Sequence, residues 1–100
     1  MSDNHQQYRV RATIYAGRDA ILTDAEVLVG VARTPEGGVM VTGEVLGLLQ
    51  PDADVPLSIH DQWGRIADIR FTHAIALEAG LGSSFFEIDG EAFAEIKPQA

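Results

Sequence analysis

Three histidines and fifteen carboxylates are the side chains with which this chain could build acid–base or metal chemistry. His60 is followed directly by Asp61, His73 lies in an alternating apolar stretch, and His5 lies near the N-terminus. A zinc site needs three or four ligands that converge at about 2 Å from the metal. The spacing supplies no third ligand for His60 and Asp61, so we predict no metal site.

Nucleophiles and phosphate-binding loops lack their usual surroundings. The chain has no cysteine, which excludes disulfides, thiolate ligands and cysteine nucleophiles. Gly80 and Gly82 are not accompanied by the third glycine, the lysine or the helix of a phosphate loop. The pair Ser83–Ser84 is not part of a Gly-x-Ser-x-Gly elbow. We therefore predict no catalytic residue and no cofactor.

The charge balance restricts the class of partner. Fifteen acidic side chains stand against seven basic ones, and the net charge is −8. Such a surface repels phosphate backbones, so we predict no nucleic-acid binding. The same charge suits an acidic inhibitor or immunity-type protein that blocks a basic site on a partner.

The length and the apolar pattern predict one domain without a membrane segment. One hundred residues are enough for one core, and no run approaches the ~18 apolar residues of a membrane span. Residues 1–7 are polar and lack the apolar centre of a signal peptide. We predict a disordered segment at 1–7, a domain at 8–97, a tail at 98–100 and a cytoplasmic location.

Alternation with a period of two residues predicts strands through most of the domain. In the stretch 69–77, Ile69, Phe71, Ile75 and Leu77 share one face with His73, so we expect a central strand and an inward-facing histidine. Ile66 is out of phase with Ile69, which predicts a bulge near residues 67–68. The rival interpretation is a short helix over 73–79. The other predicted strands cover residues 8–16, 26–34, 39–46, 55–59, 85–88 and 91–97.

Turn residues connect these strands. Thr34–Gly38 predicts an antiparallel hairpin, and Asp89–Gly90 predicts a second one before the final strand. About seven strands indicate an all-β antiparallel sandwich of immunoglobulin-like architecture. The alternatives are a small β-barrel and an α+β fold, because an apolar stripe over 19–30 also fits a helix.

Three groups of residues are candidate contact surfaces. Trp63 sits in a predicted turn, where it either folds back over the sheet or anchors a partner. The group around it is Trp63, His60, Asp61 and Arg65. The second group, on the outer face of strand 8–16, is Arg9, Arg11 and Tyr15, whose alternative is an ordinary solvated face. The third, a candidate oligomer contact near the C-terminus, is Phe85, Phe86 and Phe93.

With no sign of chemistry, the sequence favours a non-catalytic protein-interaction or assembly module that acts as a homo-oligomer. The first alternative is the acidic inhibitor described above. The second is a small-molecule binder or enzyme with a pocket near His60, Asp61 and His73, since an inward His73 would line a cavity.

Overall fold

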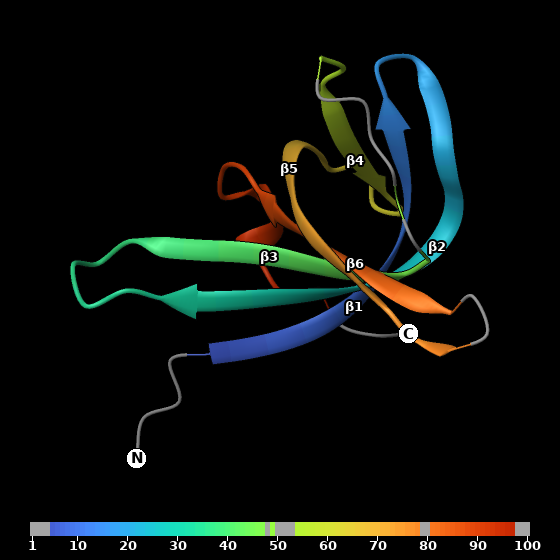
Figure 1. Ribbon diagram of the computed structural model, residues 1–100. Helices are drawn as coiled ribbons and strands as arrows, with labels where there is room; N and C mark the ends of the chain where they lie inside the picture. Colours follow the sequence, from blue (N-terminus) through green and yellow to red (C-terminus); the bar gives the residue numbers. More distant parts are fainter. Residues whose placement is uncertain (1–4, 48, 50–53, 79–80, 98–100) are drawn as a thin grey trace.

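The computed structural model describes residues 5–47, 49, 54–78 and 81–97, which form a closed barrel of six antiparallel strands (Figure 1). The order around the barrel is β1-β2-β3-β6-β5-β4, and β4 returns to pair with β1. The strands and one 3-10 helix are β1 (His5–Ala16), β2 (Asp19–Arg33), β3 (Val39–Leu46), β4 (Leu57–Asp61), β5 (Ile66–Ala76), β6 (Gly82–Ile88) and η2 (Ala92–Ala94). The predicted all-β class is confirmed.

The architecture differs from the predicted sandwich. One sheet curls until β4 meets β1, so the barrel alternative fits and the seven-stranded sandwich is not confirmed. The interior is filled by alternating residues of every strand, as Val27, Val29 and Val31 of β2 illustrate. The helical interpretation of 19–30 was wrong, because the whole segment lies within β2.

The β1–β2 hairpin is longer than its sequence suggests. Gly17 has a φ of +61°, which allows a two-residue loop between Ala16 and Asp19. Thr23 and Asp24, which precede the predicted strand 26–34, lie within β2, beside a break in the register with β1. There Asp24 has a φ of +50°, and its N–H donates to Oγ1 of Thr13 at 3.2 Å. The polar residues therefore make an irregularity within a strand pair instead of a loop.

The β2–β3 hairpin is confirmed. Val31 faces Val41, and the N–H of Thr34 donates to the carbonyl of Gly38 at 2.9 Å. Gly37 has a φ of +87°, the conformation for which glycine was expected in this turn.

The first strand begins earlier than predicted, at His5 instead of residue 8. His5–Gln7, expected to be disordered, begin β1 and face Gly30–Ala32 of β2. Residues 1–4 and 98–100, which hold the rest of the predicted disordered segment and the tail, lie outside the described residues. In the part of the chain that is described, no helix has the length and apolar character needed to cross a membrane.

The central strand β5 exists, so the helix over 73–79 was wrong, but the phase of the strand changes along its length. Phe71 faces Phe86 and His73 faces Phe85, so β5 advances two residues where β6 advances one. This bulge turns His73 to the outside and ends the inward series of Ala67, Ile69 and Phe71. The bulge expected at 67–68 is absent from the ladder, in which Ile59 faces Ala67 and Leu57 faces Ile69 without a break.

The last predicted strand, 91–97, is also wrong. Gly90 has a φ of +84° and the chain then forms η2, whose Phe93 is buried. The N–H of Asp89 donates to the carbonyl of Asp68 at 2.9 Å, which directs the C-terminal segment back toward the barrel. The segment thus buries Phe93 in place of the alternating apolar series that a strand would need.

Candidate functional site

The turn after β4 is organised by the carboxylate of Asp61. Its Oδ1 accepts the backbone N–H groups of Trp63 at 3.0 Å and Arg65 at 2.8 Å. Its Oδ2 accepts the Nε–H of Arg65 at 2.6 Å. The Asp61 side chain is 0% exposed and that of Arg65 only 12%. Asp61 thus holds the turn through two backbone N–H groups, and its ion pair with Arg65 adds a third bond.

The remaining guanidinium donors of Arg65 hold the C-terminal segment. Nη1 donates to the carbonyls of Ala92 at 2.9 Å and Glu95 at 2.7 Å, and Nη2 donates to the Tyr8 hydroxyl at 3.1 Å. The Tyr8 hydroxyl donates to the carbonyl of Phe93 at 2.6 Å, and the guanidinium carbon lies 4.6 Å from the Phe93 ring centroid. We call Tyr8, Asp61, Arg65 and Phe93 the closed end.

Burial and charge act together at the closed end. Burial raises the pKa of Tyr8, and the hydrogen bond and charge of Arg65 only partly oppose this shift. Burial alone would lower the pKa of Arg65, but its bonds to Asp61 and Tyr8 raise that pKa above its ordinary value. Arg65 therefore stays charged and Tyr8 neutral, which suits a structural network and not proton transfer.

Of the predicted contact surface around Trp63, one part belongs to the closed end and the other part lies outside it. Asp61 and Arg65 belong to the closed end, whereas Trp63 is partly exposed with its ring centroid 5.5 Å from the Arg65 guanidinium. His60 lies on β4, its ring centroid 4.5 Å from that of Tyr15 and its Nε2 3.4 Å from the Ser58 hydroxyl. Only Trp63 and His60 of this group remain available to a partner.

The residues of the proposed pocket, His60, Asp61 and His73, do not all lie close together. His60 faces Ile66 on β5, and His73 is seven residues further along that strand, about 20 Å away. The Asp61 carboxylate is buried at the closed end, and His73 is exposed on the outer face. In residues 5–47, 49, 54–78 and 81–97, no group of three or more His, Asp or Glu side chains could hold a metal ion.

The other two predicted surfaces also change. Phe86 and Phe93 are buried in the core, while Phe85 is half-buried outside and stacks on His73 with centroids 4.6 Å apart and planes 9° apart. On β1, Arg9 pairs with Glu26 at 3.3 Å and Arg11 with Asp24 at 3.6 Å. Each arginine of β1 is therefore balanced by a carboxylate of β2.

Sequence reasoning missed an exposed apolar surface beside the bulge. Leu46 and Ile75 both face Ser83, and the N–H of Leu77 donates to the carbonyl of Leu81 at 2.7 Å. These four side chains therefore extend across the ends of β3, β5 and β6. We call them the apolar tip: Leu46 (79% exposed), Ile75 (48%), Leu77 (60%) and Leu81 (66%). The alternation of residues 69–77 had predicted that Ile75 and Leu77 point inward, so the sequence did not indicate this surface.

Among the described residues, the β5 backbone beside the tip has a strand partner on one side only. The β4–β5 ladder ends where Leu57 faces Ile69. From Arg70 to Ala76, the ladders among the described residues pair β5 with β6 alone. An open strand edge presents N–H and C=O groups to any further strand.

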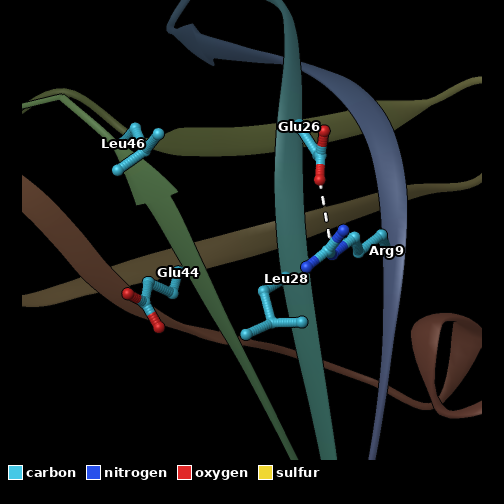
Figure 2. A pocket seen from close by; sticks show the side chains of 5 residues that line it. All are labelled: Arg9, Glu26, Leu28, Glu44 and Leu46. Atoms are coloured by element: carbon cyan, nitrogen blue, oxygen red, sulfur yellow. Dashed lines mark ion pairs between the residues drawn. The ribbon is translucent and has the colours of Figure 1, made fainter.

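A groove crosses the outer face of β1, β2 and β3 next to the tip (Figure 2). It has a volume of about 220 Å³ and is lined by Arg9, Glu26, Leu28, Glu44 and Leu46. A second hollow of about 170 Å³ shares Leu28 and Glu44 with it and extends toward Gln7, Gly30, Thr42 and Phe85. The only signal in the sequence was the outward phase of these residues, which does not reveal a depression.

Comparisons with family models, curated proteins and solved structures found no significant match for this chain. The candidate surfaces therefore rest on the geometry described above.

Proposed function

We propose that this protein is a non-catalytic, cytoplasmic interaction module that acts as a homo-oligomer. The observation that supports the proposal is the apolar tip beside the open edge of β5. Contiguous exposed apolar side chains mark contact sites more often than scattered ones do. Covering one such side chain stabilises a complex by about 1.5–3 kcal/mol when burial is complete.

A second copy of the chain is the occupant that fits best. Two β5 edges can pair antiparallel about a two-fold axis, so one segment serves both partners. The pairing would satisfy the backbone groups of 70–76 and place Ile75 and Leu77 of each copy beside the partner's β5. Because the tip is uncharged, two chains of net charge −8 can meet there with little direct repulsion.

The acidic-inhibitor alternative receives less support from the charge distribution. The carboxylates without an ion pair among the described residues come from strands and connections all around the barrel. They are Asp19, Glu36, Glu44, Asp54, Asp68, Glu78, Asp89 and Glu91. A dedicated inhibitor would gain more from one acidic face. No described cavity favours the alternative of a small-molecule enzyme around His60 and His73.

Sedimentation velocity up to millimolar protein tests the proposal. We expect concentration-dependent association of the wild type and a dissociation constant at least tenfold higher for Ile75→Glu, since both copies lose a contact. Ile66→Glu is the matched control: Ile66 is 60% exposed on the same strand but lies away from the tip.

Two results would overturn the proposal. One is a wild type that remains monomeric at millimolar concentration. The other is equal weakening by Ile75→Glu and Ile66→Glu, which would indicate an effect of added charge alone.

A further inference from the structure

We propose that the groove on β1, β2 and β3 binds a lysine or arginine side chain of a basic partner protein, with Glu44 as the carboxylate that receives it. This inference goes beyond self-association, because the occupant is a different protein and the lining residues, Leu46 excepted, lie outside the apolar tip. The partner's basic residue would be flanked by apolar or small polar residues in an extended segment.

The register of three strands builds the groove. Arg9 faces Leu28, and Leu28 faces Glu44, so the three outward side chains form one row across β1, β2 and β3. Figure 2 shows Leu28 between the arginine and Glu44, with Leu46 further along β3. The groove thus has apolar walls and a half-buried carboxylate beside them.

The charges in the groove select a cation. Arg9 is bound by Glu26 at 3.3 Å, whereas the carboxylate of Glu44 has no hydrogen bond or ion pair to another described residue. One basic and two acidic side chains leave the lining with an excess negative charge. An anionic ligand would meet two carboxylates, but an ammonium or guanidinium group could pair with Glu44.

The apolar walls select the stem of the same side chain. Lysine and arginine carry three or four methylene groups below the charged head, and these groups pack readily against apolar surface. Leu28 and Leu46 offer that surface on both sides of the groove. A free inorganic cation would use only Glu44 and leave the leucines uncovered.

The second hollow indicates that the occupant is a chain segment. It shares Leu28 and Glu44 with the first hollow and adds Gln7 and Thr42, whose amide and hydroxyl can bind a peptide backbone. A Cβ at Gly30 would lie 2.9 Å from Oγ1 of Thr42, so the glycine lets this hydroxyl lie close over β2. Both hollows, about 220 and 170 Å³, are smaller than the ~300–1,000 Å³ of drug-sized sites.

The net charge of −8 supports a basic partner on kinetic grounds. A surplus of this sign attracts positively charged proteins and accelerates encounter, and added salt weakens the attraction. The groove would convert that general attraction into a contact at one position.

The test uses a synthetic probe, the peptide Ser-Gly-Leu-Thr-Lys-Thr-Leu-Gly-Ser, titrated into isotope-labelled protein and followed by amide NMR shifts. We expect saturable shifts concentrated at residues 26–30 and 42–46. Replacing the lysine of the peptide by norleucine, which keeps the stem and removes the charge, should weaken binding at least threefold to fivefold. Glu44→Gln should weaken binding roughly threefold to fivefold, whereas Glu36→Gln, which removes the same charge from an exposed turn, should leave it within twofold.

Two outcomes would overturn the inference. One is the absence of shifts at 26–30 and 42–46 with millimolar peptide. The other is an equal effect of Glu44→Gln and Glu36→Gln, which would assign binding to overall charge. The titration is repeated on the Ile75→Glu variant, so that a failure of self-association leaves the result on the groove unaffected.

Discussion

The closed end and the apolar tip differ in whether their side chains have partners within the protein. At the closed end, Arg65 is bound to Asp61, to Tyr8 and to two backbone carbonyls. At the tip and its groove, four aliphatic side chains face solvent, and the Glu44 carboxylate has no hydrogen bond or ion pair to another described residue. The partners of a side chain, and not its type alone, therefore distinguish a structural network from a surface available for binding.

Two ion pairs show why the difference matters energetically. Arg65 and Asp61 have side chains 12% and 0% exposed, whereas Arg9 and Glu26 are 67% and 59% exposed. A buried charge that loses its partner cannot return to water, so breaking the first pair is costly. Water replaces either partner of the second pair, which therefore contributes little.

The largest effect on stability is expected when the Phe93 ring of the closed end is removed. Phe93→Ala should lower the free energy of unfolding by about 3–5 kcal/mol, because it leaves a cavity where a fully buried ring had packed. Phe85→Ala, at a half-buried outer position, should cost about 1 kcal/mol or less. Urea denaturation followed by circular dichroism measures both, and equal losses would remove the distinction between the regions.

A smaller but still large effect is expected for Arg65→Leu. We expect a loss of about 3 kcal/mol, at the lower end for a buried ion pair, since Asp61 keeps its two backbone N–H partners. Arg9→Leu should change stability by about 0–1 kcal/mol. The same denaturation experiment compares them. A loss for Arg9→Leu as large as that for Arg65→Leu would show that exposure does not govern these pairs.

The smallest effect is a pH dependence confined to the closed end. Because burial raises the folded-state pKa of Tyr8 above 10, this residue favours folding below pH 10, and the contribution is lost as the pH rises through the folded pKa. Between pH 9 and pH 11 the wild type should therefore lose stability more steeply than Tyr8→Phe. Comparing the two slopes cancels the other titrating groups, and identical slopes would contradict the assignment.

The sequence predicted the parts of the fold that depend on local pattern. Alternation identified β1 and β3, and the turn residues identified the β2–β3 hairpin. The closure of β4 onto β1 could not be predicted in this way, because strand partners are not encoded in the alternation of either strand. The same pattern fits one face of a sandwich or the inside of a barrel.

The errors at the candidate sites have long-range causes. The segment 91–97 forms no strand, since its carbonyls at Ala92 and Glu95 are bound by Arg65, 27 and 30 residues earlier. The phase of β5 depends on how β6 pairs with it at Phe71 and His73. Neither interaction can be recognised from the residues next to it in the sequence. The closed end and the apolar tip could therefore not be predicted.

Because of the bulge between Phe71 and His73, the exposure of the apolar tip depends on the number of residues in β5 as well as on their types. Beyond the bulge, one residue more or fewer in β5 exchanges the inner and outer faces. A substitution at Ile75 changes one side chain of the tip, whereas a single deletion before it would turn Ile75 and Leu77 toward the inner face together. Insertions and deletions in this strand are therefore the sequence changes by which related chains would most readily gain or lose such a surface.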